Sequence, residues 1–317
     1  MKVLVTGANG FVGRAVWQRL NSMSGVQAIG SVRGATAFTD SGASVVAVGD
    51  MSAQTHWSSA LAGVEAVVHA AARVHVMDET ATDPLTEFRR VNVQGTLHLA
   101  RQAAKAGVLR FVFISSIKVN GEATKQGSPF FADDLPAPLD PYGVSKMEAE
   151  QGLREIAAQT GMEVVIIRPP LVYGPGVKAN FAALMQIVQR GWPLPLGAVN
   201  NKRSLVALGN LVDFIATCLS HPQASNQTFL VSDGYDLSTT ELVGGLARAA
   251  GVPARLVPVP VWALRTGATL LRKADAAQRL CGNLQVDISK ARSLLGWAPP
   301  VSVDEGLRRA VTGMKKP

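Results

Sequence analysis

The sequence predicts an α/β protein built on a doubly wound parallel sheet, with a smaller and mostly helical lobe in the C-terminal half. Three observations support this expectation. Short apolar runs rich in β-branched residues alternate with helix-length segments through the first half of the chain. A glycine-spaced turn follows the first of these runs directly. Beyond Arg168, clustered prolines break the chain into loops and short elements.

The alternation of elements is typical of parallel strands joined by crossover helices. The strand-like runs are Lys2–Thr6, Gln27–Val32, Ser44–Val48, Ala66–His69, Arg110–Ser115 and Val164–Arg168. The helix-length segments include Phe11–Met23, Pro84–Ala106 and Pro141–Thr160. We therefore expect a sheet domain over residues 1–170 and a second lobe over residues 171–317, with some chain returning from the second to the first.

Composition narrows the class of protein. The chain has 317 residues, of which 47% are hydrophobic, so it can bury a large core. Its net charge of +8 suits an anionic partner, but the basic residues are scattered singly or in pairs, which argues against nucleic acid. No apolar run approaches the length of a membrane span, and the two cysteines have no metal-ligand spacing. We expect a cytoplasmic protein without a metal site.

The first turn predicts a dinucleotide site. Strand Lys2–Thr6 leads into glycines 7, 10 and 13 and then into a helix, which is the context that a Rossmann phosphate loop requires. Such glycines bring bare backbone N–H groups to a pyrophosphate at the N-terminus of the helix. The loop contributes these predicted cofactor residues: Gly7, Asn9, Gly10, Phe11, Val12 and Gly13.

The end of the second strand bears on the choice of cofactor. An acidic residue there commonly binds the ribose 2′-hydroxyl of NAD, but this strand continues into Ser31 and Arg33. A hydroxyl and a guanidinium favour the 2′-phosphate of NADP(H), with NAD(H) as the alternative. Asp50 and Met51 follow the third strand, where the carboxylate could accept a hydrogen bond from the adenine amino group.

Tyr142 and Lys146 are the predicted catalytic pair. They stand four residues apart at the start of a helix, so their side chains share one face. A nearby ammonium stabilises a phenolate and lowers the pKa of the tyrosine, which enables the phenol to exchange a proton. Ser116 follows strand Arg110–Ser115 at the sheet edge where ligands bind, and its hydroxyl could orient a reacting oxygen.

Taken in order, these motifs resemble the extended short-chain dehydrogenase/reductases, the NAD(P)-dependent nucleotide-sugar epimerase and dehydratase family. Further segments that carry the resemblance are His69-Ala70-Ala71-Ala72, Val91-Asn92-Val93-Gln94-Gly95-Thr96, Arg168-Pro169-Pro170-Leu171-Val172-Tyr173-Gly174-Pro175, Asp287 with Lys290, Leu295-Gly296-Trp297 and Pro299. The resemblance implies that Tyr142 is the acid/base and that Lys146 lowers its pKa and binds the nicotinamide ribose. It adds these cofactor residues: Ala70, Ala71, Ala72, Asn92, Tyr142, Lys146 and Pro169.

The resemblance also implies a nucleotide-sugar substrate in the C-terminal lobe. Asn180 falls where relatives hold the nucleotide-sugar, Arg203 and Arg279 fall where arginines meet its diphosphate, and His75 lies on a loop facing the sugar. Many relatives form homodimers through the helices at Pro84–Ala106 and Pro141–Thr160, so we expect a possible homodimer.

Three functions stay open at this point. Family dehydratases carry an acid–base pair just after the catalytic serine, whereas this chain has Ile117-Lys118, so dehydration is not expected. The resemblance favours NAD(P)(H)-dependent reduction of a UDP-4-keto-6-deoxy-N-acetylhexosamine for surface polysaccharide, such as lipopolysaccharide O-antigen. The alternative is a 4-epimerase of UDP-glucose or UDP-N-acetylglucosamine. A nicotinamide-binding sensor without catalysis is a remote third, since a sensor needs no polarised phenol.

Overall fold

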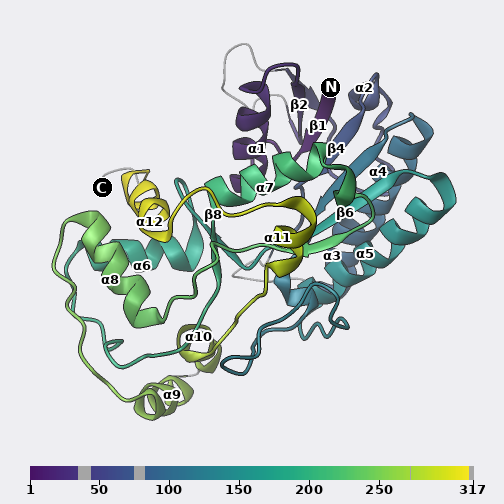
Figure 1. Cartoon of the computed structure of the whole chain (residues 1–317). Coiled ribbons are helices and arrows are strands. Elements are labelled where there is room, and N and C mark those ends of the chain that lie inside the picture. Colours follow the sequence, from purple (N-terminus) through teal and green to yellow (C-terminus); the bar gives the residue numbers. More distant parts are fainter. Residues whose placement is uncertain (35–43, 75–82, 272, 314–317) are drawn as a thin grey trace.

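The computed structural model describes residues 1–34, 44–74, 83–271 and 273–313. Its centre is a parallel seven-stranded sheet in the order β3-β2-β1-β4-β5-β6-β9, flanked by helices (Figure 1). The strands of this sheet are β1 (Lys2–Thr6), β2 (Gln27–Val32), β3 (Val45–Ala47), β4 (Ala66–His69), β5 (Arg110–Ile114), β6 (Glu163–Arg168) and β9 (Thr228–Leu230). The predicted doubly wound fold is therefore confirmed, and the order of strands reverses between β1 and β4.

Helices cover both faces of the sheet. The helices packed against it are α1 (Phe11–Asn21), α2 (Ser58–Leu61), α4 (Thr96–Lys105), α5 (Pro141–Thr160), α7 (Leu208–Ser220) and α11 (Ser289–Leu295). Residues of α1, α7 and α11 join one buried cluster, and residues of α2, α4 and α5 join another. In β1, Val3 and Val5 point into the first cluster and Leu4 into the second, because successive strand side chains face opposite sides.

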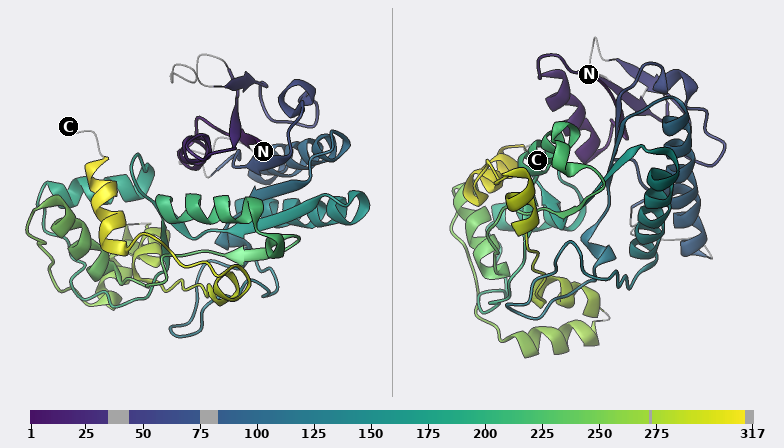
Figure 2. Two further views of the ribbon diagram at one scale, coloured as in Figure 1. Left: turned by 45° about the horizontal axis from the view of Figure 1, so that its top comes forward. Right: turned by 45° about the vertical axis from the view of Figure 1, so that its right-hand side comes forward.

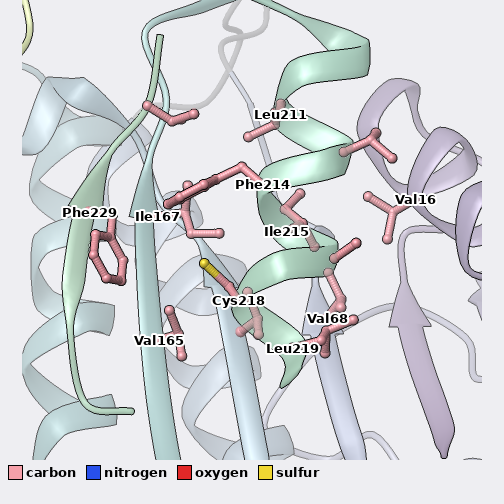
Figure 3. Close-up of a cluster of buried hydrophobic side chains, with 14 of the residues drawn as sticks. Val16, Val68, Val165, Ile167, Leu211, Phe214, Ile215, Cys218, Leu219 and Phe229 are labelled. Carbon is pink, nitrogen blue, oxygen red and sulfur yellow. The ribbon is translucent and has the colours of Figure 1, made fainter. Parts of the chain in front are cut away.

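Helix α7 shows how the second half of the chain completes this core. It lies beside α1 on the same face of the sheet, and β9 adds the seventh strand beside β6 (Figure 3). The apolar side chains that meet there include Val16, Val68, Val165, Ile167, Leu211, Phe214, Ile215, Cys218, Leu219 and Phe229. The sequence did not predict a strand at β9, since three residues are too few for a recognisable pattern.

The predicted helix over Pro84–Ala106 is in fact three segments. It comprises α3 (Pro84–Phe88), a π-helical stretch η2 (Arg89–Gly95) and α4. A π-helical turn inserts one residue into the repeat and often occurs at functional sites. Here the stretch passes close to Met51, since a Cβ on Gly95 would lie 2.9 Å from its Cγ atom.

The C-terminal lobe has its own small core. A parallel pair of strands, β7 (Leu171–Tyr173) and β8 (Leu205–Ala207), lies among helices (Figures 1 and 2). The helices of the lobe are α6 (Ala179–Gln189), α8 (Thr239–Ala250), α9 (Val261–Leu270), α10 (Ala274–Cys281) and α12 (Val303–Thr312), and two short 3-10 turns elsewhere are η3 (Ile117–Val119) and η4 (Pro222–Ala224). None of the helices among the described residues has the length and apolar character to cross a membrane.

Candidate active site

A cleft of about 510 Å³ opens at the carboxyl ends of β1, β2 and β4, next to the reversal of strand order. Ligands bind at this position in open α/β sheets. Predicted cofactor residues that line the cleft are Gly7, Asn9, Gly10, Ser31, Arg33, Asp50, Met51, Ala70, Ala71 and Ala72. Lining residues that the sequence analysis missed are Val32, Val48, Gly49, Trp57, Arg73, Val74, Arg90 and Val91. Most of these are next to a predicted residue in the sequence, so the segments that line the cleft are longer than the predicted positions alone.

The glycine loop has no space for side chains. Gly7 has φ +66°, and a Cβ on Gly13 would lie 2.2 Å from the carbonyl oxygen of Gly7. The N–H of Gly10 donates to that same oxygen at 2.8 Å, which closes the turn. Gly10 is the N-cap residue of α1, and no side chain of the described residues caps the helix there. Backbone amides of the loop therefore face the cleft, and Gly13 acts by packing beneath it.

The ends of β2 and β3 are held together at one wall of the cleft. The N–H groups of Val48 and Gly49 donate to the carbonyls of Val32 and Arg33 at 3.0 and 3.2 Å. This places the Arg33 guanidinium 3.9 Å from the Asp50 carboxylate, and both side chains are largely exposed. Ser31 is buried beside them. The wall thus offers an accessible cation, whose charge Asp50 offsets in part.

The predicted catalytic residues meet where β5 ends. Ser116 begins η3, and its Oγ accepts a hydrogen bond from the N–H of Lys118 at 3.3 Å. Asp140 caps α5 by accepting from the N–H of Gly143 at 2.6 Å, which fixes the first turn that carries Tyr142. The Ser116 hydroxyl lies near enough to Tyr142 to act on the pKa of its phenol. The structure therefore brings two residues that are distant in sequence close together.

The two titratable groups of this site have shifted pKa values. Burial, together with the charge of Asp140, raises the pKa of Tyr142 to about 12, although the nearby hydroxyl of Ser116 opposes this shift. Burial lowers the pKa of Lys146 to about 7, against the effect of Glu150. The Lys146 Nζ atom lies 4.1 Å from the centre of the Phe113 ring. Tyr142 thus holds its proton at neutral pH, while Lys146 is close to its titration point.

A buried ionic network supports α5, the helix that carries Tyr142 and Lys146. Glu150, which is fully buried on α5, accepts hydrogen bonds from Ser115 Oγ at 2.6 Å and from Arg168 Nε and Nη2 at 2.9 and 2.6 Å. Arg168 Nη1 also donates to Asn120 Oδ1 at 2.9 Å. This network ties β5, β6, η3 and α5 together next to Ser116. The sequence analysis did not identify Glu150, whose spacing of four from Lys146 was the available signal.

Asn92 and His69 lie behind the cleft and not on its wall. The Asn92 amide exchanges hydrogen bonds with the backbone of Arg73 at 2.8 and 3.0 Å, and it donates to Ser145 Oγ at 3.0 Å. His69 bonds Thr6 Oγ1 at 2.7 Å and Thr96 Oγ1 at 2.9 Å. Burial, with a smaller contribution from Lys146, lowers the pKa of His69 to about 3, so the imidazole is neutral. Both residues position the loop after β4.

Pro169 also acts through its backbone. Its carbonyl accepts a hydrogen bond from the N–H of Ile117 at 3.0 Å, which fixes the end of β6 beside Ser116. Ile117 is buried, and Lys118 forms ion pairs with Asp140 and Glu122. The position where dehydratases carry an acid–base pair therefore holds a core side chain and a paired cation.

The predicted substrate residues are distributed over the C-terminal lobe. Arg203 pairs with Leu284 across a β-bridge and donates from Nη1 to the carbonyl of Gly282 at 3.2 Å. Burial, together with the positive charge of Arg279, lowers the pKa of Arg203. Asn180 is exposed in the first turn of α6. His75 lies outside the described residues.

The chain matches the model of the family described as "NAD dependent epimerase/dehydratase family" over residues 3–232. A relative from Vibrio cholerae, named UDP-glucose 4-epimerase, is 50% identical over 308 residues, which is 97% of this chain and 93% of the relative.

Solved structures show the same fold. The UDP-glucuronic acid 4-epimerase of Bacillus cereus in complex with NAD is 23% identical and covers 99% of this chain and 98% of its own, with a TM-score of 0.80. MoeE5, solved with UDP-glucose and NAD, is 26% identical with the same coverage and a TM-score of 0.78.

Proposed function

The chain belongs to the NAD-dependent epimerase/dehydratase family, and on this premise we propose that it moves a hydride between a nicotinamide cofactor and C4 of a UDP-sugar. The observation that carries the proposal is the position of Ser116 near Tyr142 at the carboxyl edge of the sheet, one helical turn from Lys146. The 50% identical relative, named for a reaction at C4 of a UDP-sugar, supports the same position on the substrate.

The residues of the cleft fit a nicotinamide dinucleotide. The bare turn of Gly7 and Gly10, the packing of Gly13 beneath it and the uncapped first turn of α1 form a cradle for a pyrophosphate. Asp50 and Arg33 flank the place expected for the adenosine. When bound, the nicotinamide would give or take the hydride.

Tyr142 would exchange the proton of the sugar oxygen at C4, with Ser116 orienting that oxygen. Because its pKa is raised to about 12, the phenol is protonated at neutral pH and starts as a proton donor. Reduction of a carbonyl consumes a proton at the oxygen. This protonation state therefore suits the reductive direction, and the ammonium of Lys146 would stabilise the phenolate left behind.

The diphosphate of the substrate would bind between Arg203 and Arg279. Two guanidinium groups that repel one another are relieved when an anion lies between them, and bidentate contacts suit a diphosphate. Asn180 at the start of α6 would hold the nucleotide-sugar from the other side. We infer no role for His75 from the structure.

We propose reduction of a UDP-4-keto-N-acetylhexosamine, for surface polysaccharide, as the net reaction. The specific support is the wall of the cleft, where Ser31 and the exposed Arg33 suit the 2′-phosphate of NADPH. A reductase must exchange its cofactor after each turnover, and cells keep NADP largely reduced. Such a protein would work in the cytoplasm, where UDP-sugars and NADPH are available.

Epimerisation is the second candidate, and one observation favours it directly. The Vibrio cholerae relative that is 50% identical is named a UDP-glucose 4-epimerase. An epimerase returns the hydride to the same sugar, so it gains from retaining one NAD through many turnovers. The pairing of Arg33 with Asp50 would suit this reading, because Asp50 reduces the net charge that a 2′-phosphate meets.

Arg33→Ala separates the two cofactor preferences. We expect it to weaken NADPH binding by about 1.5–3 kcal/mol, the size of a charged hydrogen bond, and to leave NADH nearly unchanged. Fluorescence titration of both cofactors measures the two affinities, and Arg19→Ala, an exposed arginine on α1, is the matched control. Equal effects on both cofactors, or none, would contradict the preference for NADPH.

We also infer a homodimer through α4 and α5, which pack side by side. A two-fold axis beside them would join each pair to its copy in a four-helix bundle. Light scattering of the purified chain measures this directly.

A further inference from the structure

One face of α9 is exposed along its whole length. Its residues are Trp262, Arg265, Thr266, Thr269 and Leu270. The last four follow Trp262 by three, four, seven and eight positions, so all five share one side of the helix. The exposed fractions of Trp262 and Leu270 are 72% and 81%. The next residue, Leu271, is 73% exposed. We call these six residues the α9 face.

The two threonines make this face less polar than their residue type suggests. Thr266 donates its hydroxyl to the carbonyl of Trp262 at 3.0 Å, and Thr269 donates to the carbonyl of Arg265 at 2.9 Å. With the hydroxyls bonded to the helix backbone, the methyl groups of both threonines remain available for contact with an apolar partner. The opposite side of the helix packs against the core of the C-terminal lobe through Val261 and Leu264. The exposed side is therefore a second, separate apolar surface on a helix that is already anchored.

The charged residues in the sequence segment that contains this face are all basic. Between Glu241 and Asp275 the sequence contains no acidic residue and five basic ones. Arg248 is paired with Asp304, whereas no ion pair among the described residues includes Arg255, Arg265 or Lys273. Arg265 lies in the middle of the α9 face and Lys273 shortly beyond its end. Helices that lie in a membrane interface typically combine tryptophan and leucine with basic residues, and the α9 face has the same combination.

The position of α9 leaves the face accessible. The helix lies at the margin of the C-terminal lobe, away from the seven-stranded sheet (Figures 1 and 2). The cleft is on the other part of the molecule, at the ends of β1, β2 and β4. A flat surface could therefore contact α9 without covering the cleft.

We propose that the α9 face binds the surface of an anionic lipid membrane, with Trp262 and Leu270 inserted at the headgroup boundary and Arg265 and Lys273 against lipid phosphates. A second copy of the chain is a poorer occupant, because a two-fold contact would bring Arg265 close to its own copy. The chain would then be a peripheral membrane protein that has no membrane-spanning helix among its described residues.

Vesicle sedimentation of the full chain tests this proposal. We expect binding to phosphatidylcholine vesicles that contain phosphatidylglycerol, little binding to phosphatidylcholine alone, and release at high salt. Trp262→Ser with Leu270→Ser should weaken binding at least about tenfold. Arg265→Gln and Lys273→Gln should each weaken it about fivefold. Leu109→Ser, which removes another exposed leucine at the start of β5, should leave binding unchanged.

Circular dichroism and light scattering accompany each variant. An unchanged spectrum shows that lost binding is not lost folding. Absence of binding to the anionic vesicles, or binding that the α9 substitutions leave unaltered, would overturn the proposal. A dimer of the native chain that becomes a monomer in Trp262→Ser would also overturn it, because the face would then be a contact between copies.

Discussion

Lys146 and Glu150 are buried one helical turn apart on α5, where burial lowers the pKa of the lysine to about 7 and the charge of the glutamate opposes that shift. Glu150 also binds Ser115 and Arg168. One carboxylate thus affects the charge of a residue proposed for catalysis and joins its helix to Ser115, just after the end of β5.

Glu150→Gln should destabilise the fold. Arg168 is only 2% exposed, so loss of the carboxylate leaves a buried cation without its partner, at a cost of about 3–5 kcal/mol in the free energy of unfolding. Urea denaturation followed by circular dichroism measures this cost. Glu155→Gln, an exposed carboxylate on the same helix, should change stability by less than about 0.5 kcal/mol. Equal effects of the two substitutions would disprove the structural role.

Tyr142→Phe tests the proton transfer. Turnover should fall by about 10²–10⁴, or about 3–5 kcal/mol in barrier, because the hydroxyl proposed to exchange the proton is removed. Cofactor affinity should change little, since the ring remains. Tyr235→Phe, which alters an exposed hydroxyl at 59% exposure, serves as the control. Near-normal turnover of the Tyr142 variant would exclude it as the acid/base.

Gly13→Val tests the phosphate loop. The added Cβ would lie 2.2 Å from the oxygen and 2.7 Å from the carbon of the Gly7 carbonyl, so the turn cannot keep its shape. Titration should detect no nicotinamide binding. Gly267→Ala is a matched substitution, since a Cβ there meets nothing within 4 Å and the backbone is helical. Retained affinity in Gly13→Val would place the phosphate site elsewhere.

His69 should make stability depend on pH below neutrality. Its pKa is about 3 in the folded chain against an ordinary value of 6.5, so the unfolded chain binds more protons as the pH falls below 6.5. Its contribution is complete above that pH and is lost progressively toward pH 3. Between pH 7 and pH 5 this amounts to about 2 kcal/mol.

Denaturation at both pH values measures the slope. In His69→Gln the protein should be less stable at pH 7, because two buried hydrogen bonds are altered, but its stability should lose most of this pH dependence. His56→Gln, at an exposed position, should keep the native slope. A native slope in His69→Gln would show that other groups cause it.

Local patterns were sufficient for much of this structure. Sequence periodicity predicts features that depend on residues within one helical turn or one strand. The glycine loop, the strand boundaries and the pair of Tyr142 and Lys146 are features of this kind. Contacts between distant segments were not readable from pattern. Examples are the seventh strand β9, the bonds of His69 to Thr6 and Thr96, and the effect of the Arg279 charge on the pKa of Arg203. Each of these contacts depends on how whole helices and strands pack together, and the sequence of one segment alone does not determine that packing.

Asn92 illustrates the difference between finding a residue and assigning its role. The sequence placed it among the cofactor residues, whereas its amide is used by the backbone of Arg73 and by Ser145. Its contacts suggest that it shapes the loop that lines the cleft. The structure thus gives Asn92 a supporting task toward a neighbouring loop, and its contact with a cofactor stays a prediction.

Isotope transfer tests the central claim most directly. The protein is incubated with NADPH that carries two deuterium atoms at nicotinamide C4 and with a UDP-4-keto-6-deoxy-N-acetylhexosamine, and the product is examined by mass spectrometry and NMR. We expect one deuterium at C4 of the sugar for each NADPH consumed, and none with Tyr142→Phe. If the protein instead arrives with bound NAD and interconverts UDP-hexose 4-epimers without consuming cofactor, net reduction is wrong and epimerisation replaces it. A hydride that reaches no carbon of the sugar ring, with neither reaction observed, would contradict the whole account.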